Sequence, residues 1–201
     1  MKSKKKREHK FNFREEYKLS FDYLRESKNF IYFSIGLFLV FSLIGFFVPV
    51  PESIKVKILE MIQELLQQTE GLGWGGLISF IFSNNIQSSF FSMVFGVFLG
   101  ILPILSAMFN GYLLGFVLAM VIKTEGIFSF WRLLPHGIFE LPAIFISFGL
   151  GIKFGTFIFW KKRVEKFQEY FWNSLRVFLF VILPLLILAA IIEGTLIFLG
   201  N

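Results

Sequence analysis

The sequence lacks cysteine altogether and contains only two histidines among its 201 residues. Without cysteine, the chain has no disulfide, no thiol nucleophile and no cysteine-ligated metal site. One histidine, His9, lies in a basic stretch near the N-terminus, which leaves too few histidines for a metal site with three or four ligands. The HExxH pattern of zinc hydrolases is also absent. We therefore expect neither a metal nor another cofactor.

Charged residues are scarce as well. They make up 17% of the chain, whereas hydrophobic residues make up 55% and the mean hydropathy is +0.69. A soluble domain of this length could not bury so much apolar surface, and the apolar runs are longer than a core helix needs. The composition predicts an all-α polytopic integral membrane helical bundle. We interpret the 30 phenylalanines as lipid-facing and bundle-filling bulk.

Positive charge is concentrated at the N-terminus. The 28 residues before the first apolar run are too many for a cleavable signal peptide, and no small-residue cleavage site follows. We expect 1–28 to be a retained cytoplasmic segment whose part 11–28 forms an amphipathic helix. Such a segment binds anionic lipid rather than nucleic acid. Its most basic stretch consists of Lys4, Lys5, Lys6 and Arg7.

The rest of the chain, 29–201, is expected to be a single membrane domain. The apolar run 77–122 is too long for one crossing, and SNN at 83–85 and NG at 110–111 interrupt it. Pro103 is expected to kink the helix between these interruptions. Prolines 49 and 51 end the first span, and an outer amphipathic helix is expected over 52–70. The predicted spans are 30–48, 86–108, 112–123, 136–160 and 177–199.

The distribution of lysine and arginine supports five spans. Ten of these residues precede the first span, and five lie in 161–176, among them Lys161, Lys162 and Arg163. Cytoplasmic loops of membrane proteins carry an excess of these residues. With five spans, both basic segments face the cytoplasm, which predicts an N-terminus inside and a C-terminus outside.

Small residues recur one helical turn apart in the apolar runs. A GxxxG spacing lets two helix backbones approach closely, either within one chain or between two copies. The sequence leaves both open, so a homodimer is one expectation. The three pairs are Gly96 and Gly100, Gly111 and Gly115, and Gly151 and Gly155.

A segment with two ionisable residues, PHGIFELPA at 135–143, lies at the start of the fourth predicted span. His136 and Glu140 lie four apart, so they share one face of a helix. Together with Asn84, Asn85 and Asn110 they are candidates for a polar intramembrane cluster, which either ties spans together or binds or relays a proton or ligand. Glu193, near the outer end of the last span, is expected to contact water.

Four segments together resemble the stage II sporulation protein M family of small membrane proteins. They are FSNN at 82–85, GVFLG at 96–100, NGYLLG at 110–115 and LLPHGIFELPAIFISFGLGIKFG at 133–155. The resemblance covers about residues 30–199, and the five-span count agrees with it. It implies a membrane anchor and scaffold: the family's namesake holds two cell-wall-degrading partner proteins during engulfment of the forespore and has no enzymatic activity of its own.

The sequence thus favours a non-enzymatic scaffold in the cytoplasmic membrane, with the lipid bilayer and other membrane or envelope proteins as its partners. The alternative is a permease, or the membrane subunit of a transporter, with a polar site at His136, Glu140 and Asn110. An intramembrane hydrolase ranks last. It would need a nucleophile, and the available serines are ordinary small residues at span edges.

Overall fold

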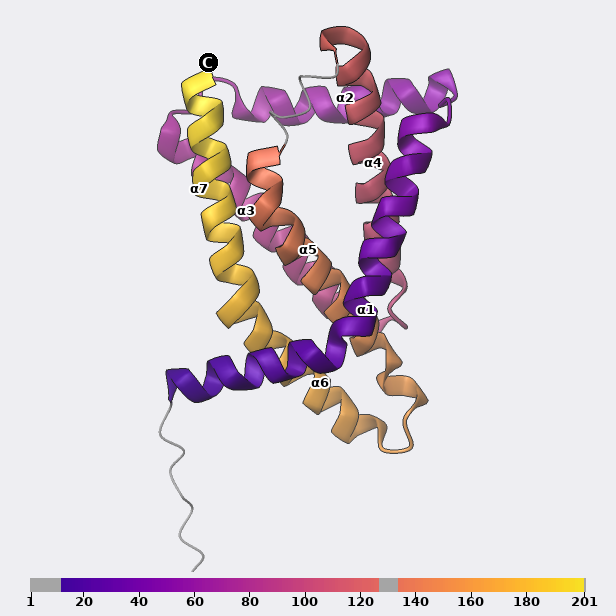
Figure 1. The fold of residues 1–201 in the computed structure, drawn as a ribbon, viewed down its shortest axis with the longest axis vertical. Coiled ribbons are helices and arrows are strands. Elements are labelled where there is room, and N and C mark those ends of the chain that lie inside the picture. The colour runs from indigo at the N-terminus through magenta and orange to yellow at the C-terminus, as the bar shows by residue number, and fades with distance from the viewer. Residues whose placement is uncertain (1–11, 127–133, 201) are drawn as a thin grey trace, which may run out of the picture.

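The computed structural model describes residues 12–126 and 134–200, which form helices joined by short turns (Figure 1). These two stretches contain no β-strand, which confirms the all-α prediction for them. The α-helices are α1 (Phe13–Phe47), α2 (Glu52–Thr69), α3 (Trp74–Val94), α4 (Ile101–Glu125), α5 (Leu134–Gly155), α6 (Arg163–Val177) and α7 (Leu183–Gly200). Between them lie the 3-10 helices Phe95–Val97 and Thr156–Phe159 and the π-helix Phe178–Ile182.

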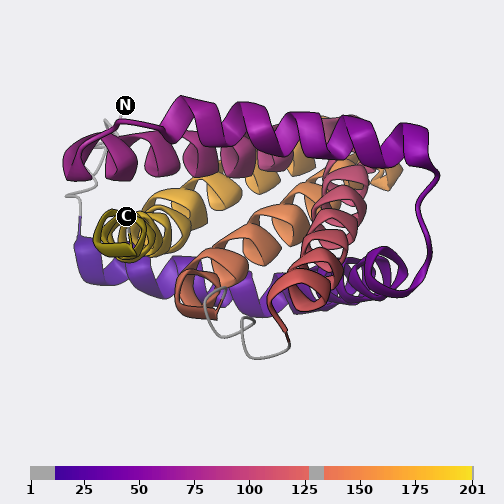
Figure 2. The ribbon, with the colours of Figure 1, turned by 90° about the horizontal axis from the view of Figure 1, so that it is seen from above.

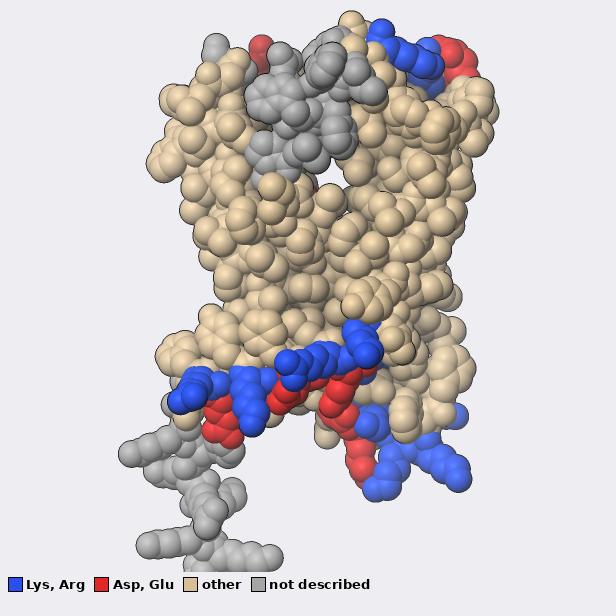
Figure 3. All heavy atoms as spheres, in the orientation of Figure 1, with Lys and Arg blue, Asp and Glu red and all other residues tan. Residues whose placement is uncertain are grey.

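Most of these helices suit a membrane. Among the described residues, four helical stretches are long and apolar enough to cross one, namely Phe13–Phe47, Ile101–Thr124, Gly137–Phe159 and Arg163–Gly200. Figure 3 shows a broad uncharged band between two charged ends of the molecule. Helix α3 runs between the same two ends but is not one of the four (Figure 1). The architecture therefore fits a membrane protein with at least four apolar helices.

Helix α1 combines two elements that the sequence predicts separately, an amphipathic helix over 11–28 and a span over 30–48. It begins at Phe13, where the side chain of Asn12 accepts a hydrogen bond from the backbone N–H of Arg14 at 3.1 Å. Its first turns lie across one end of the molecule, and the rest runs to the other end (Figure 1). Ser20 and Ser27 donate to carbonyls four residues back, a bond that bends helices.

The predicted division of the central apolar run, with spans over 86–108 and 112–123, is wrong. Helix α3 continues through the SNN segment, and α4 continues through Asn110 and Gly111. The chain instead turns between the 3-10 helix Phe95–Val97 and α4, where Leu99 and Gly100 have φ of 57° and 70°. Asn110 does not break α4 because its Nδ2 donates to the Ser106 carbonyl one turn back, at 2.8 Å.

Pro103 lies in the first turn of α4 and so does not kink a span. Backbone N–H groups of the first helical turn have no acceptor within the helix, so a proline there removes no helical hydrogen bond. The same reasoning explains why Pro142, inside α5, is the more disruptive residue. The effect of each proline on its helix therefore depends on how far the proline lies from the start of that helix.

The basic segment 161–176 proves to be mostly helical. Helix α6 crosses the same end of the molecule as the first turns of α1 (Figure 1). An ion pair between Arg176 and Glu16 joins the two helices, and both side chains are about three-quarters buried. The predicted spans over 136–160 and 177–199 correspond to α5 with its following 3-10 helix and to the π-helix with α7. A layer of two amphipathic segments thus covers this end.

Helix α2 covers the opposite end, as the predicted amphipathic helix over 52–70 suggests. It begins after Pro51 and buries only Ile58 among its 18 residues. Seen from that end, α2 runs along one side of the bundle rather than over its centre (Figure 2). Few residues of the other helices pack against it, so α2 is held mainly by its two connections.

The glycine pairs allow helices of the same chain to pack closely. A Cβ at Gly111 or Gly115 would collide with the α1 backbone at Phe38 or Ser42. Likewise, a Cβ at Gly96 would meet the Gly151 backbone, and Gly155 lies against Leu99 and Gly100. All six predicted packing glycines therefore lie in contacts within one chain, so a homodimer would need other surfaces.

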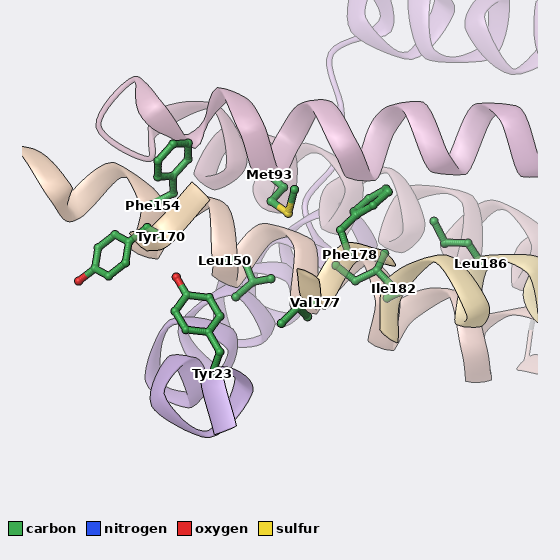
Figure 4. Close-up of a cluster of buried hydrophobic side chains, with 10 residues drawn as sticks. Tyr23, Met93, Leu150, Phe154, Tyr170, Val177, Phe178, Ile182 and Leu186 are labelled. Atoms are coloured by element: carbon green, nitrogen blue, oxygen red, sulfur yellow. The ribbon is translucent and has the colours of Figure 1, made fainter. Parts of the chain in front are cut away.

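The hydrophobic core gathers residues from most of the bundle. Figure 4 shows side chains from α1, α3, α5, α6 and α7 meeting near the end covered by α6. Leu150 from α5, Val177 from α6 and Leu186 from α7 are completely buried. The other members are Tyr23, Met93, Ala143, Phe154, Tyr170, Phe178 and Ile182. This cluster anchors α6 and the first turns of α1 to the bundle.

Candidate functional site

A polar cavity lies under α2, between α3, α5 and α7. Its volume is about 350 Å³, and it opens to the surface. Four polar side chains of the apolar helices line it: Asn84 and Asn85 from α3, Glu140 from α5 and Glu193 from α7. Apolar side chains and one hydroxyl complete the wall, namely Ile62, Leu65, Leu66 and Thr69 from α2, Phe80 and Ile81 from α3, and Ile197 from α7.

Helix packing brings these residues together. Gly194, next to Glu193, lies against Ile78 of α3, so α7 approaches α3 closely at this level. The indole Nε1 of Trp74 at the start of α3 donates to Thr195 Oγ1 of α7 at 3.0 Å, which fixes the same pair of helices. Glu140 reaches the cavity from the second turn of α5. Three separate helices therefore contribute polar groups to one cavity.

The electrostatics of the cavity are unusual for an apolar bundle. Glu140 and Glu193 line the same cavity. Neither carboxylate has a hydrogen-bond or ion-pair partner among the described residues, and no described lysine or arginine lines the cavity. Two such carboxylates beside apolar walls favour a proton or a cation. The two asparagines add amide groups that can accept or donate hydrogen bonds.

Only some residues of the predicted polar cluster lie together in the structure. Asn84, Asn85 and Glu140 line the cavity, whereas Asn110 lies on α4 and bonds its own helix. The backbone of His136 is helical, but its side chain lies outside the described residues, as does any contact with Glu140. Within the described chain, no group of three or more histidine or acidic side chains could hold a metal ion.

Glu193 is the residue that the sequence interpretation misses. Its position near the end of the chain suggests contact with water, which an open cavity permits, but does not indicate that it lines the same cavity as Glu140. One feature of the sequence could have identified Glu193. It is a lone carboxylate in an apolar span, and such residues usually face the bundle interior. The sequence could not show that Glu193 shares a cavity with Glu140, because α5 and α7 are brought together only by the fold.

The predicted basic surface lies at the other end of the molecule, in the band of charge that Figure 3 shows there. Lys161, Lys162 and Arg163 are exposed at the start of α6. Lys162 pairs with Glu165 at 3.0 Å, and both side chains are more than two-thirds exposed. Lys4, Lys5, Lys6 and Arg7 lie outside the described residues. Lys161, Lys162 and Arg163 therefore lie at the opposite end from the polar cavity.

Comparison with known proteins gives one family. A family model described as stage II sporulation protein M matches residues 34–196. The match includes all four polar residues of the cavity and all six packing glycines. Neither the curated proteins nor the solved structures gave a match.

Proposed function

The chain belongs to the stage II sporulation protein M family, and we propose that it is a non-enzymatic scaffold that holds partner proteins at the cytoplasmic membrane. The observation that carries this proposal is α2. It lies across one end of the bundle as a separate amphipathic helix and leaves most of its length free of the other helices (Figures 1 and 2).

Exposed apolar side chains suit α2 to binding a protein. Ile54 and Val56 are 47% and 43% exposed, and Leu65 and Leu66, which line the cavity beneath α2, are also exposed. Glutamates and glutamines lie between these apolar residues along the helix. An amphipathic helix with uncovered apolar residues commonly docks against a groove or a second helix. We therefore assign α2 as the docking surface for an envelope partner.

The orientation that we propose follows from charge. The end formed by α6 and the first turns of α1 carries most of the described basic residues, and we infer that it faces the cytoplasm. Helix α3 then serves as a fifth span, and two of its polar residues, Asn84 and Asn85, line the cavity. An odd number of spans puts α2 and the C-terminus outside, and the basic N-terminal segment inside as a second docking surface.

Site-specific photocrosslinking in intact membranes tests the scaffold proposal. A benzophenone amino acid is introduced at Val56 of α2, which is 43% exposed, or, as a control, at Phe91 of α3, which is 48% exposed. We expect protein adducts from position 56 and lipid adducts from position 91. Equal yields of protein adduct from both positions would refute α2 as the docking surface.

The polar cavity favours a second candidate function, the passage of protons or cations. Glu140, Glu193 and the two asparagines supply polar groups at one level of the bundle, as a transport site requires. Helix α2, which packs loosely over the cavity, would control access to it.

Flux into proteoliposomes tests this candidate. An imposed membrane potential should drive cation or proton entry faster with the protein than into protein-free vesicles. Glu140→Gln and Glu193→Gln should each abolish the added flux, whereas Asn110→Ala, outside the cavity, should retain it. Equal rates in wild-type and protein-free vesicles would eliminate transport and leave the scaffold proposal untouched.

A further inference from the structure

A second hollow, at the end opposite α2, combines charged and aromatic residues. It has a volume of about 640 Å³ and lies where the end of α5 meets α1 and α6. Figure 3 shows that this end carries the boundary between the uncharged band and a charged band. The lining residues are Glu26, Phe30, Lys153, Thr156, Phe159, Trp160, Lys166, Glu169 and Tyr170.

Lys153 forms the floor of this hollow. A lysine near a span end usually extends to the lipid headgroups, but Lys153 is only 5% exposed. Its Nζ donates to Ser27 Oγ at 3.0 Å and lies 3.6 Å from a carboxylate oxygen of Glu26 and 3.7 Å from the centre of the Tyr23 ring. These contacts lock α5 to α1, so the hollow has a fixed shape.

The walls offer both signs of charge. Lys166 is partly exposed, bonds Glu169 at 2.7 Å and lies 4.9 Å from the centre of the Trp160 ring. Opposite charge is supplied by Glu26, whose side chain is 67% exposed although it pairs with Lys153. With two lysines and two glutamates, the hollow is neutral overall. Such a site suits a zwitterion better than a simple anion.

The rim of the hollow carries aromatic residues of the kind found at membrane interfaces. Phe159 and Trp160 are 80% and 49% exposed beside the hollow. Aromatic residues at the level of the headgroups anchor proteins in the interface. A lipid whose headgroup enters the hollow would lay its chains against these rings and the apolar band.

We propose that this hollow binds the headgroup of a zwitterionic phospholipid with a free ammonium group. The phosphate accepts a hydrogen bond from the Lys166 ammonium. The lipid ammonium pairs with the Glu26 carboxylate and lies against an aromatic face, which attracts cations. The bound lipid then bridges α1, α5 and α6. The proposal requires only that the protein lies in a membrane and is independent of its partners.

Native mass spectrometry of the full chain with added lipid tests this site. Phosphatidylethanolamine should bind about tenfold more tightly than phosphatidylglycerol, as expected for one added charge-assisted contact. Lys166→Ala should remove most of the phosphatidylethanolamine binding. Lys162→Ala is the matched control, because Lys162 forms the same type of pair with Glu165 three residues on but lies outside the hollow.

Glu26→Gln separates headgroup recognition from a general loss of folding. It should lower the affinity for phosphatidylethanolamine about tenfold without lowering that for phosphatidylglycerol, because the contact with the lipid ammonium is lost while the hollow gains net positive charge. Equal binding of the two lipids by the wild-type protein would overturn the proposal. Equal effects of Lys166→Ala and Lys162→Ala would do the same.

Discussion

Single glycines decide how closely the helices of this protein approach. At Gly115 an added Cβ would meet the backbone of Ser42, which cannot move without separating α1 from α4. The sequence could indicate these positions, because GxxxG spacing is a local pattern. It could not say whether the facing helix belongs to the same chain, since that depends on the fold.

Gly115→Ala is therefore expected to destabilise the bundle by about 1–3 kcal/mol through overpacking. Gly36→Ala is the control, because nothing lies within 4 Å of the Cβ it would add. That variant should change stability by no more than about 1 kcal/mol, toward higher stability, since alanine favours the helix. Unfolding in mixed detergent micelles measures both, and equal losses would refute the α1–α4 contact.

Carboxylates show the limit of residue-scale prediction. Glu140 stood out in the sequence because a histidine and two prolines surround it, whereas Glu193 had no such neighbours. Their proximity arises from the packing of α5 and α7 with α3, which no spacing in the chain encodes. The candidate cavity could therefore be predicted only in part, from Asn84, Asn85 and Glu140.

At the scale of helices, the sequence was informative about apolar length and misleading about breaks. Asparagine followed by glycine often marks a turn, but in α4 the asparagine bonds its own helix and the glycine faces α1. The chain actually turns at Gly100, the second glycine of the Gly96 and Gly100 pair. A packing glycine and a turn glycine have the same local sequence signature, so only the fold separates them.

Two substitutions distinguish these roles. Gly100→Ala should lower the free energy of unfolding by about 1–2 kcal/mol, because its φ of 70° is unfavourable for a residue with a Cβ. Asn110→Ala should change it by less than about 1 kcal/mol, because the amide bonds only a carbonyl of its own helix. The opposite order would indicate a turn at Asn110, as the sequence suggests.

The attachment of α6 to α1 depends on a partly buried ion pair. A double-mutant cycle with Glu16→Gln and Arg176→Gln should give a coupling energy of about 1 kcal/mol or more, since three-quarters of each side chain is buried. The exposed pair of Lys162 and Glu165 should give less than about 0.5 kcal/mol. Equal coupling energies would mean that Arg176 and Glu16 do not form this ion pair in the folded protein.

At the scale of the whole molecule, the bundle joins two chemically different ends. One end carries α6, the start of α1 and most of the charge. The other carries α2 (Figure 1), which lies above a polar cavity. Composition and charge distribution were sufficient to predict an all-α membrane bundle. The side-by-side placement of α2 and the cavity was not predictable, because it depends on how α3, α5 and α7 pack.

The most direct test of this account is the sidedness of its two ends, because the cysteine-free chain permits single-cysteine variants. Gln67→Cys places a thiol on α2 and Gln168→Cys places one on α6, both at exposed positions. A membrane-impermeant maleimide should label intact cells at position 67 and reach position 168 only after permeabilisation. Labelling of both positions from the same side would contradict the five-span arrangement and the proposed outer location of α2.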